Sequence, residues 1–400
     1  MTHDETFDAI VVGGGPSGAT AATDLARAGR RVALLDRAGR IKPCGGAVPP
    51  RLLRDFDVPL SLLVARATSA RMIAPSSRAV DMEVGGFVGM VDRDVFDEWL
   101  RARAADEGAV RIAGTFESLD RDPDGTAVIC YRPKDAARGS APSRVRTKAV
   151  VGCDGGRSGV ARAAIPKGAN VPFVAAYHEV IESPANGTDG FNGSRCDVYY
   201  QGRLSPDFYA WVFPHGGQTS VGVGSARKGF PLREAVAELR RDTGLDGCTT
   251  VRCEGAPIPL KPLKRWDNGR DVIVAGDAAG VVAPASGEGI YYAMTAGRFA
   301  AQSVDRFLAT GNAKELATAR KRFMKAHGQV FWVLGIMQHF WYSSDKRRER
   351  FVKICEDPDV QQLTWDAYMN KELVRAKPAA HVRIFFKDLG HLMGIGRVAH

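Results

Sequence analysis

The 400-residue chain lacks the sequence features that mark several large protein classes. Its seven cysteines are scattered, odd in number and without a C-x-x-C pair, which is typical of reduced thiols rather than of a disulfide framework. Its eight histidines show no metal-ligand spacing. Residues 1–6 are polar and acidic, so we expect no signal peptide, and no internal repeat is visible. These absences favour a cytoplasmic globular protein without a bound metal.

Positive charge is concentrated near the C-terminus. Residues 311–400 contain 16 lysines and arginines against 9 acidic residues, so +7 of the total net charge of +10 lies there. An apolar, aromatic run at 330–342 precedes a basic cluster at 346–350, and it is too short to cross a bilayer. Either a helix on an anionic membrane surface or a core helix with a solvated charged end fits this pattern. Peripheral contact with a membrane, through 329–350 and the tail, therefore stays open.

Nucleic acid is a poor partner for this tail. Its aromatic side chains stand in apolar runs and are not interleaved with the basic residues.

A glycine-rich turn near the N-terminus predicts a dinucleotide site. Residues 7–12 form a short apolar run, typical of a buried parallel strand, and Gly13, Gly15 and Gly18 follow at once. In such a turn the first glycine makes the bend, the second lets a pyrophosphate approach the backbone, and the third lets the helix pack on the strand.

The segments after this turn complete the pattern. A helix is predicted over 17–28, and its N-terminus, with Ser17, presents free N–H groups to phosphates. A second strand over 31–36 ends in Asp36, where a carboxylate can bind the adenosine ribose. This pattern alone does not separate FAD from NAD.

Two later glycine segments favour FAD. A strand over 149–152 leads into a turn that contains Asp154, and a strand over 271–276 ends beside Asp277, a candidate for the ribityl chain. A turn at 284–290 then opens a helix through about residue 307, whose first N–H groups can face the electron-accepting edge of a flavin. An NAD dehydrogenase has no need of this late pair. The cofactor candidates from these two segments are Asp154, Gly276, Asp277, Gly287, Gly289 and Ile290.

Four motifs carry a family resemblance. They are K-P-C-G-G at 42–46, V-D-R-D-V-F-D at 91–97, P-D-F-Y-A-W-V-F-P at 206–214 and G-E-G-I at 287–290. With them the chain resembles flavoproteins of the para-hydroxybenzoate hydroxylase fold, and within these the geranylgeranyl reductases, most closely those of chlorophyll and bacteriochlorophyll biosynthesis. The resemblance covers roughly residues 5–390.

The resemblance implies an α/β (α+β two-domain) fold. A Rossmann-like FAD-binding domain is expected from residues 1–165 and 266–310, with about 51–90 contributing to a second layer. A mixed or antiparallel sheet over 166–265 is expected to bind substrate, and 311–400 to form a basic, aromatic-rich helical region.

The resemblance also implies a set of FAD contacts, and two of them have plain alternatives. Arg93 either contacts the cofactor or pairs with an acid of its own helix. Cys44 is either a small spacer against the flavin ring or a chemical group. Cys153 stands where the class more often has alanine. The contacts that carry over are Ser17, Asp36, Cys44, Gly45, Arg93, Asp277, Gly289 and Ile290.

Three short antiparallel strands are predicted at 196–200, 208–213 and 218–224, divided by glycine and proline turns. Along the middle strand Tyr209, Trp211 and Phe213 share one face. That face lines either a substrate cavity or an ordinary sheet core.

The resemblance implies a flavin-dependent reductase of photosynthetic pigment synthesis, with the inner or photosynthetic membrane as the one it would contact. In such an enzyme NADPH is expected to reduce FAD, and hydride is expected to pass to isolated double bonds of a geranylgeranyl chain, giving the phytyl form. The expected substrates are a prenylated chlorin or a prenyl diphosphate, and Cys44, Tyr209 and a bound water are the proton-donor candidates. An aromatic or quinone monooxygenase, a reductase of archaeal-type prenyl ether lipids and a non-enzymatic carrier remain alternatives. The NADPH site and the oligomeric state are not defined by the sequence.

Overall fold

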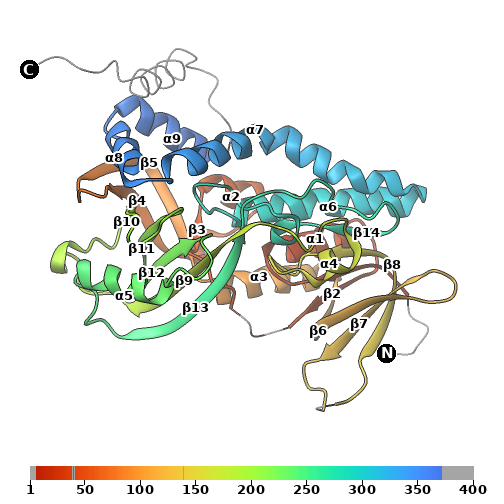
Figure 1. The fold of residues 1–400 in the computed structure, drawn as a ribbon. Helices are drawn as coiled ribbons and strands as arrows, with labels where there is room; N and C mark the ends of the chain where they lie inside the picture. The colour runs from red at the N-terminus through yellow and green to blue at the C-terminus, as the bar shows by residue number, and fades with distance from the viewer. Residues whose placement is uncertain (1–5, 38, 40, 138, 372–400) are drawn as a thin grey trace, which may run out of the picture.

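The computed structural model describes residues 6–37, 39, 41–137 and 139–371, and its strands form two sheets (Figure 1). In the first sheet, parallel strands run in the order β6-β2-β1-β8-β14, and β7 pairs antiparallel with the outer parts of β6 and β8. The strands are β1 (Thr6–Val12), β2 (Val32–Asp36), β6 (Val110–Arg121), β7 (Ala127–Pro133), β8 (Ser143–Gly152) and β14 (Val272–Val274).

The second sheet has eight strands in the order β13-β9-β12-β11-β10-β4-β5-β3. Neighbouring strands are antiparallel except β10 and β4, which are parallel. The three antiparallel strands predicted between 196 and 224 are confirmed as β10, β11 and β12. The strands are β3 (Ala47–Val48), β4 (Leu63–Ile73), β5 (Ala79–Val91), β9 (Phe173–Glu182), β10 (Arg195–Tyr199), β11 (Ala210–His215), β12 (Gln218–Ser225) and β13 (Thr250–Pro259).

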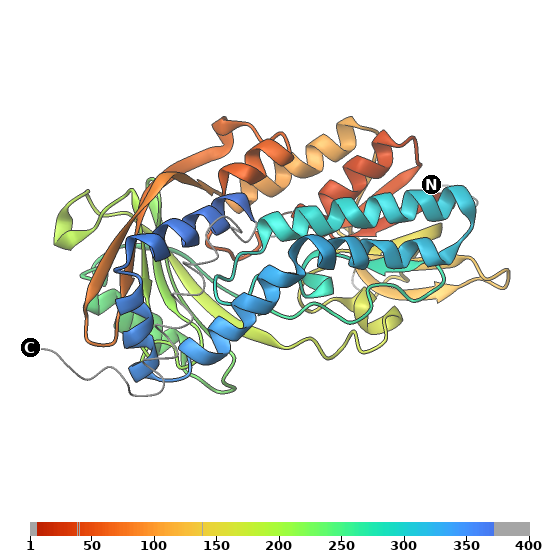
Figure 2. The same cartoon turned by 90° about the horizontal axis from the view of Figure 1, so that it is seen from above.

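Helices pack on the first sheet and bridge to the second. Figures 1 and 2 show α6 and α7 side by side, with α7, α8 and α9 passing from the first sheet across to the second. None of the helices that the structure describes is long and apolar enough to cross a membrane. The helices are α1 (Pro16–Arg27), α2 (Pro50–Asp55), α3 (Arg93–Asp106), α4 (Gly159–Ala164), α5 (Leu232–Asp242), α6 (Ile290–Thr310), α7 (Thr318–Trp341), α8 (Asp345–Ile354) and α9 (Pro358–Asn370).

The predicted strand–turn–helix–strand unit at the N-terminus is confirmed. Strand β1 is apolar and buried over most of its length because helices cover the parallel sheet, so both of its faces are packed. The strand predicted over 271–276 is shorter than expected. It ends at Val274 because Gly276 adopts a φ of +64° and begins a 3₁₀ turn, Gly276–Ala279.

The C-terminal helices have exposed apolar side chains as well as buried ones. On α7, Val330 and Phe331 are buried, whereas Trp332 is 67% exposed and Ile336 is 48% exposed. The basic cluster that follows is also divided, because Arg348 is buried and donates to the carbonyls of Pro206 and Tyr342. The apolar run is therefore partly core and partly surface, and contact with a membrane stays a prediction.

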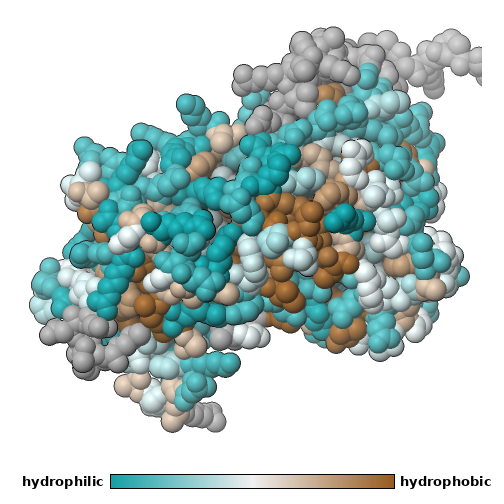
Figure 3. Space-filling view, turned by 180° about the vertical axis from the view of Figure 1, so that it is seen from behind, coloured by the Kyte–Doolittle hydropathy of each residue, from teal (hydrophilic) through white to brown (hydrophobic). Residues whose placement is uncertain are grey.

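The back of the molecule is largely hydrophilic. Figure 3 shows apolar side chains gathered near the middle of that face and bordered by hydrophilic ones. A gathered apolar patch does not by itself say what covers it, so this face alone assigns no function.

Candidate active site

The three glycine segments that stand far apart in the sequence meet in the structure. A β-carbon on Gly13 (φ +104°) would collide with the Cys153 carbonyl, and one on Gly276 would lie 2.7 Å from the Ser17 β-carbon. The Ser17 hydroxyl in turn lies 3.5 Å from the Cys153 sulfur. The first turn, the end of β8 and the end of β14 therefore pack so closely that no side chain fits at Gly13 or at Gly276.

Gly15 differs from its neighbours. A β-carbon on Gly18 would collide with the Gly13 carbonyl, but one on Gly15 would meet no atom within 4 Å. Protein packing thus explains Gly13 and Gly18 and leaves Gly15 unexplained. An open cradle at the N-terminus of a helix, beside free N–H groups, suits the phosphates of a dinucleotide.

Asp36 lies beside this turn at the end of β2. A β-carbon on Gly14 would lie 2.9 Å from the Asp36 side chain. Arg101 of α3 donates to the Gly14 carbonyl at 3.2 Å and lies 3.5 Å from the Asp36 carboxylate. The acid is therefore held beside the glycine turn, and its contact with a ribose stays a prediction.

Asp154 is engaged within its own segment. Its carboxylate accepts from the Ser158 hydroxyl and from the N–H groups of Gly159, at 2.6 Å, and Val160, at 3.2 Å. Burial raises the pKa of this carboxyl, and these hydrogen bonds oppose the rise. The contacts of Asp154 in the structure are those of a cap on α4.

Lys42 and Cys44 of the K-P-C-G-G segment make separate contacts. The Lys42 ammonium pairs with the Asp277 carboxylate, which is mostly buried. Cys44 accepts from the Gly46 N–H at 3.4 Å.

Arg93 donates two hydrogen bonds, at 2.9 and 2.8 Å, to Asp97 one helical turn later. The structure thus shows the pairing of Arg93 within its own helix that the sequence left open.

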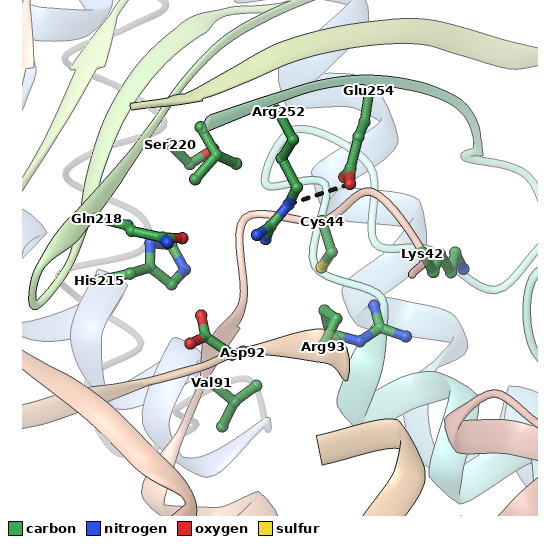
Figure 4. Close-up of a pocket in the computed structure, with 11 residues that line it drawn as sticks. Lys42, Cys44, Val91, Asp92, Arg93, His215, Gln218, Ser220, Arg252 and Glu254 are labelled. Carbon is green, nitrogen blue, oxygen red and sulfur yellow. Dashed lines mark ion pairs between the residues drawn. The ribbon is translucent and has the colours of Figure 1, made fainter. Parts of the chain in front are cut away.

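A small cavity lies between the K-P-C-G-G segment and the second sheet (Figure 4). Its volume is about 10 Å³, close to what one water molecule requires. Cys44 and Arg93 approach it from one side, and Ser220, Arg252 and Glu254 approach it from strands β12 and β13. Polar side chains from two distant parts of the chain therefore meet beside Cys44.

A buried hydrogen-bond chain leads from this cavity to Trp211. The Trp211 indole N–H donates to the Ser220 hydroxyl at 3.1 Å. Ser220 lies 2.8 Å from Nδ1 of His178, and Nε2 of His178 lies 3.1 Å from the Glu254 carboxylate. Burial alone would raise the pKa of Glu254, but His178 and Arg252 hold it below its ordinary value. The chain fixes the orientation of the indole.

The aromatic face predicted on the middle strand is confirmed, and it touches two of the motifs. Tyr209, Trp211 and Phe213 belong to one cluster, whereas Ala210 and Val212 pack on the other side of the sheet. The Tyr209 hydroxyl donates to the Ser286 carbonyl at 2.6 Å, just before G-E-G-I. A β-carbon on Gly45 would lie 3.1 Å from the Phe213 ring. The aromatic face therefore lies between the C-G-G segment and the G-E-G-I turn.

Comparison with known proteins identifies the family. The chain is 54% identical over 390 residues to a geranylgeranyl diphosphate reductase of Rhodobacter capsulatus, covering 97% of this chain and 98% of that protein. It is 35% identical to a chloroplastic geranylgeranyl diphosphate reductase of Oryza sativa, covering 96% and 85%. The chain belongs to the geranylgeranyl reductase family.

The fold comparisons agree with this placement. Residues 11–63 match the NAD(P)-binding Rossmann-like domain family. A solved geranylgeranyl bacteriochlorophyll reductase-like protein from Thermoplasma acidophilum is similar with a TM-score of 0.79 and 22% identity, over 93% of this chain and 98% of that one. A flavin-dependent brominase is similar with a TM-score of 0.70 and 15% identity, over 97% and 100%. The geranylgeranyl reductase family thus shares its fold with other flavin-dependent enzymes.

The structure adds residues that sequence reasoning did not assign. Two of these residues could have been found from local sequence. Lys42 is the first residue of the K-P-C-G-G motif, and Arg101 follows Arg93 and Asp97 at the four-residue spacing of one helix face. His178, Ser220 and Glu254 had no local signal, because strand pairing brings them together.

Glu288 within G-E-G-I is a further unassigned residue. It is buried and pairs with Lys371, and its second oxygen, Oε1, has no hydrogen-bond partner among the residues that the structure describes. Burial raises the pKa of its carboxyl, although Lys371 opposes the rise.

Proposed function

We propose that this protein is a flavin-dependent reductase that saturates isolated double bonds of a geranylgeranyl chain. The chain belongs to the geranylgeranyl reductase family, and one structural observation carries the proposal. The aromatic strand, with Tyr209, Trp211 and Phe213, is wedged between the segment of Cys44 and the turn that opens α6. An unconjugated olefin needs an apolar slot against the reducing group, and this arrangement supplies its walls.

The residues around the glycine turns fit FAD. The open cradle at Gly15 suits its pyrophosphate, Asp36 its ribose and Asp277 its ribityl chain. We assign the remaining contacts to Ser17, Gly45, Gly289 and Ile290. Arg93 is left out of this set, because its guanidinium pairs with Asp97 in its own helix. Bound FAD, reduced by NADPH, would supply the hydride.

The chain's own side chains would stabilise charge on the olefin. Proton transfer to one alkene carbon leaves cationic character on the other, and an aromatic face stabilises a cation. Trp211 is suited to this because Ser220, His178 and Glu254 fix its ring.

Among the proton-donor candidates, Tyr209 is the least suited. Its hydroxyl proton is engaged by the Ser286 carbonyl, and burial raises its pKa. We therefore propose the cavity beside Cys44, with Cys44 or a water there, as the source of the proton.

The architecture supports the expected division of the chain. The first sheet draws on 6–152 and 272–274, which suits an FAD domain made of 1–165 and 266–310. Strands β4 and β5 join the second sheet, which suits a contribution of about 51–90 to the substrate layer over 166–265. Residues 311–400 would then form the C-terminal region, which includes α7, α8 and α9. We propose that the enzyme is cytoplasmic and lies beside the membrane that holds its apolar substrate.

Product analysis tests the function. Purified protein would be incubated without oxygen with FAD, NADPH and either geranylgeranyl diphosphate or geranylgeranyl bacteriochlorophyll, and product masses would be measured. Mass gains of two hydrogens per reduced bond are expected. Substrate-dependent oxygen uptake with a hydroxylated product would instead establish a monooxygenase, and an unchanged substrate mass with a flavin that stays reduced would leave only a carrier.

A further inference from the structure

An ion pair joins the K-P-C-G-G segment to the turn after β14. The Lys42 ammonium pairs with the Asp277 carboxylate, although the two residues are 235 positions apart. The Asp277 side chain is 8% exposed, whereas that of Lys42 is 38% exposed. The carboxylate therefore lies in the protein interior, and its counter-ion reaches it from the surface.

The start of α6 lies next to the same carboxylate. A β-carbon on Gly289, the residue before α6, would lie 3.9 Å from Oδ1 of Asp277. The N-terminus of a helix carries a partial positive charge. Lys42 supplies a full unit of charge, and no other ion pair of Asp277 occurs among the residues that the structure describes.

The nearby guanidinium of Arg93 is already engaged. Arg93 lines the same cavity as Lys42 and Cys44, but it pairs with Asp97, and both of these side chains are buried. Figure 4 shows that the Lys42 ammonium points away from the middle of that cavity. Removing the Lys42 charge would therefore leave Asp277 as an unpaired interior carboxylate.

The place of this carboxylate gives the pair a chemical meaning. The proposed function assigns Asp277 to the ribityl chain of FAD. That chain is attached to the flavin ring beside its N1–C2=O edge. Hydride from NADPH brings two electrons and one proton, so its addition leaves one negative charge on the ring, at this edge. A nearby carboxylate repels that charge, and a nearby ammonium attracts it.

Burial makes this effect strong. Charges interact more strongly in a protein interior than in water, because the effective dielectric constant is lower. Asp277 is mostly buried, so its charge would act with little screening on a ring beside it. The pair of Asp277 with Lys42 carries no net charge and avoids this repulsion.

We propose that Lys42 sets the reduction potential of the flavin by neutralising Asp277 beside the N1–C2=O edge. Asp277 would hold the ribityl chain as an ionised acceptor, and Lys42 would prevent the same charge from opposing reduction by NADPH. This inference rests on the proposed function, because it uses the flavin site assigned there. Lys42 is thus a tuning residue, and it takes no part in the transfer of hydride or proton.

Sulfite titration tests the proposal without any prenyl substrate. Sulfite adds to N5 of an oxidised flavin and leaves a negative charge at the N1–C2=O edge, so its affinity reports the charge beside that edge. In Lys42→Met, assayed at saturating FAD, we expect the Kd for sulfite to rise at least about tenfold. The midpoint potential of the flavin should fall by about 30 mV or more, because this is the equivalent of a tenfold change in a two-electron equilibrium.

Matched variants separate the charge of Lys42 from its packing. Lys42→Arg keeps the charge and should stay within about threefold of the wild-type Kd for sulfite. Lys42→Met combined with Asp277→Asn removes both charges, so this Kd should return towards the wild-type value. A role in packing alone predicts instead that the double variant is no better than Lys42→Met. Lys148→Met is the control and should change neither quantity, because Lys148 pairs with Asp8 near the start of β1, away from the turn at Gly13.

The outcomes for the tuning residue and for the reductase are distinct. An unchanged Kd for sulfite and an unchanged potential in Lys42→Met would overturn the role of Lys42, and so would a double variant that binds sulfite no better than Lys42→Met. Neither measurement needs turnover. If the charge effect is present but both prenyl substrates stay unreduced, the role of Lys42 stands and the proposed function fails. If the wild type reduces them and the charge effect is absent, the proposed function stands and the role of Lys42 fails.

Discussion

The two sides of the proposed active site are built in different ways. On the side of the first sheet, backbone meets backbone, and Gly13, Gly18 and Gly276 are needed because a β-carbon would collide. On the side of the second sheet, long side chains meet, and Trp211 is held by a chain of hydrogen bonds that ends at Glu254. The first side therefore requires glycines, which lack a β-carbon, and the second side requires particular side chains that hydrogen-bond to one another. Substitutions should therefore act differently on the two.

The largest effect is expected at the glycine turn. Gly18→Val would place a side chain on the Gly13 carbonyl, and overpacking of a buried turn costs typically 1–3 kcal/mol and more when backbone cannot move. We expect a fall in the free energy of unfolding of at least about 3 kcal/mol, measured by urea denaturation.

Gly15→Ala is the matched control for that substitution. Its new methyl group meets no protein atom, so stability should stay within about 0.5 kcal/mol while flavin affinity falls. Equal losses of stability in the two variants would contradict the distinction between Gly15 and Gly18.

Trp211 should separate catalysis from cofactor binding. Trp211→Ala removes the aromatic wall and should reduce prenyl turnover at least about a hundredfold with the flavin still bound. Trp211→Phe keeps an aromatic face and should retain more activity than Trp211→Ala. The measurements are product mass per unit time and the flavin absorbance of the dialysed protein. Wild-type turnover in Trp211→Ala would remove this residue from the substrate wall.

Asp277 tests the other side of the site. Asp277→Ala leaves Lys42 without its partner and removes the proposed ribityl contact. We expect flavin affinity to fall about tenfold to a hundredfold, as measured by fluorescence titration of the apoprotein. An unaltered flavin content after dialysis would argue against the assigned role.

The smallest effect is expected from the pH dependence of the His178–Glu254 pair. The pKa of Glu254 is lowered in the folded protein, so its contribution to stability is present above the ordinary value near 4.5 and is lost as pH falls through the lowered pKa. Unfolding free energies of wild type and Glu254→Gln should therefore differ near pH 7 and converge in acid. A difference that stays constant from pH 7 to pH 3 would show that ionised Glu254 contributes no stability.

The sequence specified the first side of the site far better than the second. Gly13, Ser17, Asp36 and Asp277 were predicted because a short strand, a glycine turn and an acid are local patterns with a physical reason. The three segments were also expected together, and the contacts between Ser17, Cys153 and Gly276 confirm that they meet.

The second side depended on pairing that no local pattern encodes. His178 and Ser220 meet across β9 and β12, and His178 and Glu254 across β9 and β13. Only the alternation of Tyr209, Trp211 and Phe213 was visible in advance, because side chains alternate along any strand. Asp154 is a different case, since an acid after a strand suggested a ligand contact, and its carboxylate accepts from N–H groups of α4. Its contact with a cofactor stays a prediction.

The ion pair between Lys371 and Glu288 links the C-terminal helices to the turn before α6. The two residues are 83 positions apart, and both are buried. Removing Lys371 would leave the buried Glu288 carboxylate without its counter-ion at the turn assigned to the cofactor, which costs several kcal/mol. The helices from α7 to α9 therefore cannot be removed without destabilising the turn before α6. A chimera that exchanges these helices between relatives would have to exchange the G-E-G-I turn with them.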